Sequence, residues 1–196
     1  MVKGCYKITN RTNINTGDYW DTRQITGNTN NGTSALESIM EWIKEHADIK
    51  EDASVLDIGS GPCKPGAFLM HMKKHFKCNC ISVDISKEIC KTWEKENIES
   101  FNYVLPRLDF EDNTFDVILC SHVLEHIDEI EESAMEIKRV LKPNGIAIMN
   151  SPIGQGWAGE AEHVWWMGEE LDFDIGDIIT SFTGNQFNSL VQVYKK

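Results

Sequence analysis

The sequence contains no run of about 18–20 apolar residues, the length that a membrane-spanning helix needs. The first ten residues, MVKGCYKITN, also lack the apolar core of a secretory signal. We therefore expect a cytoplasmic protein with no membrane partner. A length of 196 residues allows one domain with its own core and hardly two.

The six cysteines include no Cys-x-x-Cys pair. This absence argues against a zinc knuckle and against a thioredoxin-like redox motif. Free thiols are the usual state of cysteine in an intracellular protein, and we expect them here.

Cations are missing from a long stretch of the chain. No Lys or Arg lies between Pro143 and Tyr194, whereas seven carboxylates lie between Glu160 and Asp177. The net charge is −12. Because a nucleic-acid binder needs cations to displace counterions from phosphates, we expect no nucleic-acid partner.

From residue 33 onward, strand-like segments alternate with amphipathic helices. This alternation predicts an α/β fold of the Rossmann-like, doubly wound type, with a mostly parallel seven-stranded sheet and a C-terminal antiparallel hairpin. The predicted strands are 54–58, 80–84, 101–105, 115–120 and 146–149, followed by a hairpin of 178–182 and 190–194. One predicted helix ends at about residue 75, a second begins after Ser86 as its N-cap, and a third covers 127–141. The segment 169–175 fits either a strand or a helix.

The domain boundary is predicted at residue 32. Residues 1–32 are polar with little periodicity and form an N-terminal arm, and residues 33–196 form a single domain. Within the arm, Tyr19 and Trp20 stand beside Arg23. Two aromatic side chains in a polar arm need a place to be buried, either on the domain surface or as a flap over a ligand.

Glycines follow the first predicted strand of the domain, at positions 59 and 61. Glycines at a strand-to-helix turn let a ligand approach the backbone closely. Lys64 stands where a dinucleotide motif has its third glycine, and no Gly-Lys-Ser/Thr follows as in a P-loop. Asp84 ends the next strand, where an acid can accept both hydroxyls of a ribose. Asp57, two residues before the glycines, suits a cationic ligand group.

Five segments in order resemble the class I S-adenosylmethionine-dependent methyltransferases, in the type 11-like branch that acts on small molecules. They are VLDIGSG at 55–61, VDIS at 83–86, LDFEDNTFDVI at 108–118, SHVLEHI at 121–127 and RVLKPNG at 139–145. The resemblance implies that S-adenosyl-L-methionine is the cofactor. Two positions depart from the family pattern: Cys63 replaces a common third glycine, and Val104 stands where an acid usually meets the adenine amino group.

The resemblance also implies a set of cofactor-binding residues. The glycines would admit the methionine part, Asp84 would hold the ribose, and Ile85 would pack on adenine. The full set is Asp57, Gly59, Ser60, Gly61, Asp84, Ile85, Cys120 and His122, with Tyr19, Trp20 and Arg23 of the arm as an N-terminal cover.

The implied activity is methyl transfer to a small-molecule acceptor, which we expect to be neutral or cationic because the segment from Glu160 to Asp177 is acidic. An acceptor that must lose a proton would need a base. The candidates are His122, His163 and the pair of Glu160 and Glu162, and the pattern does not single out one of them.

Two alternatives remain open. His122, Glu125 and His126 have the H-x-x-E-H spacing of inverted zinc peptidases, which would bind zinc, whereas the methyltransferase interpretation expects no metal. The chain could also be a non-catalytic module that binds S-adenosylmethionine without transferring its methyl group.

Overall fold

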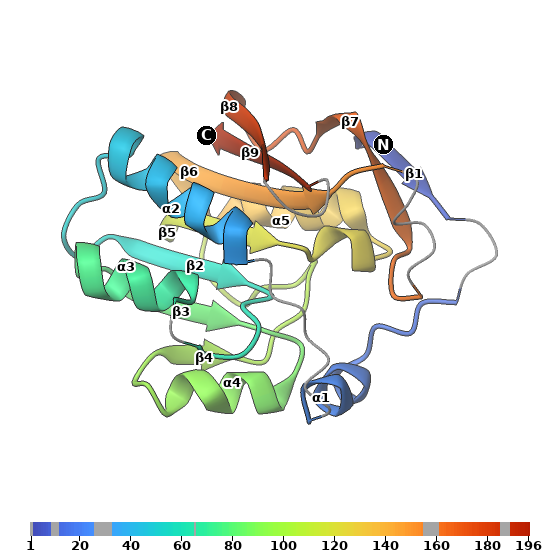
Figure 1. The fold of residues 1–196 in the computed structure, drawn as a ribbon, viewed down its shortest axis with the longest axis horizontal. Coiled ribbons are helices and arrows are strands. Elements are labelled where there is room, and N and C mark those ends of the chain that lie inside the picture. The colour runs from blue at the N-terminus through green and yellow to red at the C-terminus, as the bar shows by residue number, and fades with distance from the viewer. Residues whose placement is uncertain (1, 9–11, 26–32, 65, 155–160, 185–188) are drawn as a thin grey trace.

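The computed structural model describes residues 2–8, 12–25, 33–64, 66–154, 161–184 and 189–196 (Figure 1). The helices are α1 (Gly17–Ile25), α2 (Thr33–His46), α3 (Phe68–Phe76), α4 (Lys87–Glu94) and α5 (Ile130–Val140), with a 3-10 turn η1 (Leu124–His126). The strands are β1 (Lys3–Lys7), β2 (Ser54–Ile58), β3 (Asn79–Val83), β4 (Glu99–Phe101), β5 (Phe115–Ser121), β6 (Leu141–Pro152), β7 (Trp165–Asp172), β8 (Asp177–Gly184) and β9 (Ser189–Lys195). None of these helices, over the residues described, is long and apolar enough to cross a bilayer.

A seven-stranded sheet organises the domain, in the order β4-β3-β2-β5-β6-β9-β8. Strands β2 to β6 are parallel, and β9 pairs antiparallel with both β6 and β8. The predicted fold, including the C-terminal hairpin, is confirmed. The arrowheads of β2, β3 and β4 point toward the edge where α1 and the β1–β7 pair lie (Figure 1).

The sheet is covered on both faces, by α2, α3 and α4 on one side and by α5 on the other (Figure 1). Val55 and Val117 belong to the first core, which lies between the sheet and α2, α3 and α4. Leu56 and Ile118 belong to the second core, on the side of α5, and all four residues are at most 1% exposed. This two-sided burial explains why the strand sequences are almost continuously apolar. Trp93 anchors α4 in the first core with no exposed surface.

Several predicted boundaries differ from the structure. The strand expected at 146–149 is longer, because β6 begins at Leu141, directly after α5, and extends to Pro152. The strand expected at 101–105 is β4, which ends at Phe101. It ends there because the side-chain amide of Asn102 donates to the carbonyls of Asp84 and Ile85. The helix expected at 127–141 begins only at Ile130, because the chain before it forms η1 and Ile127 is extended. The predicted Ser86 cap is confirmed: its Oγ accepts the N–H of Ile89 at 3.2 Å.

The N-terminal residues contain a strand that the sequence analysis did not predict. β1 pairs antiparallel with β7 in a separate two-stranded sheet, with Cys5 opposite Met167. Gly4 has φ +76°, and a Cβ there would lie 2.6 Å from the backbone nitrogen of Leu171. Because β7 extends to Asp172, the first part of the ambiguous segment 169–175 is a strand.

Candidate functional site

The glycine loop after β2 is open on one side. Gly59 and Gly61 have φ +65° and +59°, in the left-handed region that favours glycine. A Cβ on Gly59 would lie 2.3 Å from Cγ2 of Val123, whereas nothing lies within 4 Å of one on Gly61. A ligand can therefore approach the backbone at Gly61, while Gly59 packs directly on the chain after β5.

Asp84 connects this loop to the start of α4. Its Oδ2 accepts the N–H of Gly61 at 3.1 Å, and its Oδ1 accepts the N–H of Ser86 at 2.9 Å. Burial raises the pKa of Asp84 to about 6, although both N–H bonds favour the ionised form. Each carboxylate oxygen keeps a second acceptor position, so Asp84 can still accept from hydroxyls of a ligand.

Asp57 lies close to Asp84 at the end of β2 and is 5% exposed. Burial, and then the charge of Asp84, raises the pKa of Asp57 well above its usual range. A cationic ligand group beside the loop would relieve both effects.

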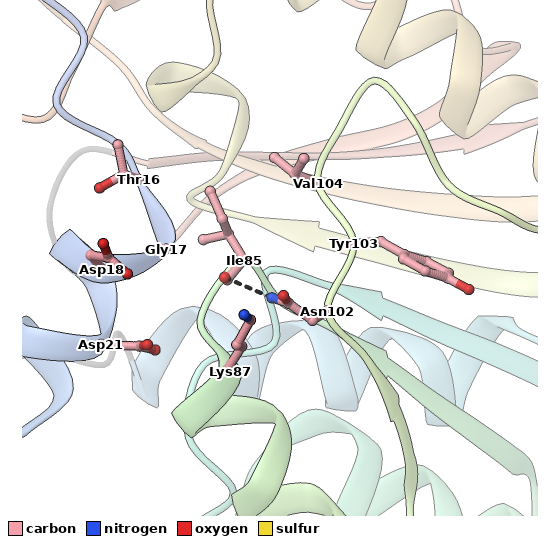
Figure 2. Close-up of a pocket in the computed structure, with 9 residues that line it drawn as sticks. All are labelled: Thr16, Gly17, Asp18, Asp21, Ile85, Lys87, Asn102, Tyr103 and Val104. Carbon is pink, nitrogen blue, oxygen red and sulfur yellow. Dashed lines mark hydrogen bonds between the residues drawn. The ribbon is translucent and has the colours of Figure 1, made fainter.

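A pocket of about 300 Å³ lies beside the turn from β3 to α4 (Figure 2). Residues of α1 form one wall, and Ile85 faces them from the other. The exposed side chain of Val104 lies on the same side as Ile85, where the family usually has an acid. The lining residues are Thr16, Gly17, Asp18, Asp21, Ile85, Lys87, Asn102, Tyr103 and Val104.

Helix α1 docks on the start of α4. Asp21 Oδ1 accepts the hydroxyl of Ser86 and, at 3.2 Å, the N–H of Glu88. The arm therefore covers the pocket through Gly17, Asp18 and Asp21 rather than through its aromatic residues.

Tyr19, Trp20 and Arg23 contact a different region. The Tyr19 hydroxyl donates to Oε1 of Glu162 at 2.6 Å, and Arg23 forms an ion pair with the same carboxylate. The Trp20 ring meets the His126 ring edge-on, with 5.3 Å between centroids. Their role as a cofactor cover stays a prediction, because their described contacts are with η1 and the segment before β7.

The segment after β5 brings the predicted histidines together. His122 has φ +55° and its N–H donates to the Asn150 carbonyl at 2.8 Å. Its Nδ1 lies 3.3 Å from Oε1 of Glu125, which is fully buried. The rings of His126 and His163 lie edge-on at 4.9 Å. Of the weak base candidates, only the side chain of His122, at 35%, is substantially exposed, and Glu160 lies outside the described residues.

Cys120 offers little side-chain surface to a ligand. It is 2% exposed, and burial raises the pKa of its thiol well above the usual value. The hydroxyl of half-buried Ser60 hydrogen-bonds that of Ser82 at 3.0 Å. Both residues stay predicted ligand contacts.

The geometry does not suit a zinc peptidase. Glu125 would have to act as general base on a peptide, but it is fully buried on a 3-10 turn. Moreover, the residues whose ligand atoms cluster are Glu125, His126 and His163, and His122 is outside that group.

Sequence reasoning missed Asn102, which lines the pocket and fixes the turn after β3. A polar residue directly after a strand, at the carboxyl edge of a parallel sheet, was the available signal. Glu162 was named only as a base candidate beside Glu160, and its contacts with α1 were not predicted, because its partners there lie more than 130 residues away in the chain.

In comparison with known protein families, residues 56–149 match the family described as a methyltransferase domain. An uncharacterized protein of Methanocaldococcus jannaschii is 39% identical over 100 residues, covering 51% of this chain and 41% of that protein. The ubiquinone biosynthesis O-methyltransferase of Rickettsia felis is 27% identical over 121 residues, covering 59% of this chain and 48% of that enzyme. The matches thus span less than half the length of each of these curated relatives.

Among solved structures, the cyclase SpnF has a TM-score of 0.74 at 14% sequence identity, covering 95% of this chain and 96% of that one. At this identity the likeness shows the fold alone. The same fold therefore also occurs in a protein described as a cyclase.

Proposed function

We propose that the chain is a class I enzyme that transfers a methyl group from S-adenosylmethionine to a small-molecule acceptor, on the premise that residues 56–149 match a methyltransferase domain. The observation that carries the proposal is the link from Gly61 through Asp84 to Ser86 at the carboxyl ends of β2 and β3. This link places the open backbone of Gly61 beside the pocket, together with the Asp84 carboxylate, which could accept from ribose hydroxyls.

The residues present fit the cofactor. Space is open at Gly61, where the backbone would lie along the methionine part, and Asp84 has acceptor positions left for ribose hydroxyls. Ile85 offers an apolar surface in the pocket for adenine, and a cationic ligand group beside Asp57 would favour the charged form that burial and Asp84 disfavour. The cofactor supplies an activated methyl group on a sulfonium, so the protein's main task is positioning, which can contribute about 7–11 kcal/mol.

We propose a neutral or cationic acceptor. Asp18 and Asp21 outnumber Lys87 in the pocket lining, no Lys or Arg lies between Pro143 and Tyr194, and the chain as a whole has a net charge of −12. A polyanionic acceptor would meet repulsion from these groups at close range. His122 is the base candidate whose side chain a bound acceptor could reach.

The test is calorimetric titration with S-adenosylhomocysteine of the wild type, Asp84→Asn and Asp116→Asn. Asp116 is the matched control, because it also accepts a backbone N–H, from Ser54 at 2.9 Å, but at the opposite end of the sheet. We expect micromolar binding to the wild type and the control. Loss of two hydrogen bonds to a carboxylate should weaken binding to Asp84→Asn at least about 100-fold.

Absence of binding to the wild type would overturn the proposal. Binding without methyl transfer to any of a panel of neutral and cationic compounds would favour the non-catalytic module. Turnover of RNA or DNA would overturn the proposed acceptor class and leave the cofactor site standing.

A further inference from the structure

Glu125 is a fully buried carboxylate with two histidine rings beside it. The residue has no exposed surface, and neither carboxylate oxygen accepts a hydrogen bond from the residues that the structure describes. Its Oε1 lies 3.3 Å from Nδ1 of His122 and 3.9 Å from Nε2 of His126. A buried carboxylate without hydrogen bonds is costly unless a cation sits beside it.

His126 is held in the tautomer that binds metals. Its Nδ1 lies 3.1 Å from the carbonyl oxygen of Glu162. A carbonyl can only accept, so Nδ1 carries the hydrogen and Nε2, which faces Glu125, carries the lone pair. Histidines that bind metals are oriented in this way, with the second ring nitrogen donating to a carbonyl or carboxylate.

His163 supplies a third ligand atom from a different part of the chain. It is 7% exposed, and one ligand atom each from Glu125, His126 and His163 lie within 4.8 Å of one another. Ligand atoms at about 2.0–2.2 Å from one ion are about 3–4 Å apart, so small side-chain shifts would close the site. The N–H of Val164, donating to the Glu125 carbonyl at 2.8 Å, holds the two segments together.

We propose that Glu125, His126 and His163 bind one divalent transition-metal ion. Two imidazoles and one carboxylate suit borderline cations such as Zn²⁺ and Co²⁺, and leave at least one coordination position open. The proposal departs from the expectation of no metal, because His163 lies 37 positions from His126 and sequence spacing did not connect them.

The position of the proposed metal site indicates what a bound ion would do. It lies at the carboxyl edge of the sheet, next to His122, and Trp20 of α1 covers the His126 ring. Because Glu125 has no exposed surface and Trp20 covers the His126 ring, a bound ion would hold η1 to the segment before β7 rather than contact an acceptor. Metal binding does not depend on methyl transfer.

The experiment titrates the chelator-treated 196-residue chain with Co²⁺ and follows heat and visible absorption. The variants are Glu125→Gln and His163→Ala. His71→Ala and His75→Ala are matched controls, because these two histidines stack at 4.1 Å one turn apart on α3 and could bind a metal adventitiously. We expect one Co²⁺ per wild-type and control chain, and binding at least about 100-fold weaker in both site variants.

A thermal melt separates loss of the site from loss of folding. A metal concentration 100 times Kd should raise the wild-type Tm by about 5–10 °C. Without metal, the Tm of Glu125→Gln measures its folding directly, and this Tm should not respond to added metal.

Co²⁺ binding that survives Glu125→Gln, or that is lost with His71→Ala, would overturn the proposal, as would absence of binding to the wild type. S-adenosylhomocysteine titration of the same samples reports the proposed function separately. A chain that binds that ligand but no Co²⁺ loses only the metal proposal.

Discussion

The two sides of the site are built in different ways. On the cofactor side, the glycine loop, Asp84 and Ile85 are close in sequence and are held by the ends of two neighbouring strands. On the opposite side, α1, η1 and the residues before β7 meet from three distant parts of the chain, and Glu162 joins them through Tyr19 and Arg23. The first side is a local consequence of the fold, and the second depends on long-range contacts.

The two sides should therefore respond differently to mutation. Changes on the cofactor side act on backbone conformation and on a buried carboxylate, so they should affect folding and binding together. Changes on the α1 side remove contacts between segments, so they should affect how well the site is closed while the sheet stays intact.

The largest effect is expected for Gly59→Ala. Its Cβ would collide with Val123 and the backbone would be strained at φ +65°, so the free energy of unfolding should fall by about 2–4 kcal/mol. Gly61→Ala has the strain without the collision and should lose about 1 kcal/mol. Chemical denaturation measures both variants.

A second substitution locates the cause of the Gly59→Ala effect. Val123→Ala should recover part of the loss in Gly59→Ala and none in Gly61→Ala. Equal losses in the two glycine variants, unaffected by Val123→Ala, would mean that the contact with Val123 does not limit the loop.

The next effect is a dependence on pH through Asp84. Its pKa of about 6 means that ribose hydroxyls meet a protonated carboxyl below that pH. Affinity for S-adenosylhomocysteine should therefore be level above about pH 7 and fall by up to about tenfold per pH unit below 6. Asp84→Asn should remove this dependence, and calorimetry across pH 5–8 measures it.

The same group has the opposite effect on stability. Because its pKa is higher in the folded chain than the ordinary value of 3.8, the folded state binds more protons between about pH 4 and 6. The contribution of Asp84 to the free energy of unfolding should thus decrease as pH rises through that window. A difference between wild type and Asp84→Asn that grows in the other direction would contradict the burial argument.

The contrast between the two sides also explains what the sequence could predict. Apolar runs such as residues 115–120 indicated the parallel strands, because a strand buried on both faces leaves that pattern. Asp57, the glycines and Asp84 stood at strand ends, where topology alone brings them together. Residues 3–7 gave no signal, because the strand is short and its burial depends on β7. The partnership of Glu162 with Tyr19 likewise follows from tertiary packing.

A moderate effect is expected for Glu162→Gln on the α1 side. The change removes the charge that pairs with Arg23 and leaves the shape of the side chain. Hydrogen exchange in residues 17–25 should increase, and affinity for S-adenosylhomocysteine should fall about tenfold because α1 forms one wall of the pocket. Unchanged exchange in α1 would show that the Asp21 contacts with Ser86 and Glu88 suffice to hold it.

The smallest effect is expected for Tyr19→Phe, which removes one hydroxyl from the same contact. The Tyr19 hydroxyl donates to Glu162 and accepts from Arg23 at 2.9 Å, so its loss should cost about 0.5–1.5 kcal/mol of the docking of α1. Tyr6→Phe is the matched control, because Tyr6 also donates to a glutamate, Glu170, but on the exposed surface of the β1–β7 pair. Ligand titrations should weaken severalfold for Tyr19→Phe and stay unchanged for Tyr6→Phe. Equal affinities would mean that the closure of α1 does not limit ligand binding, and the long-range side of the site would then serve the acceptor alone.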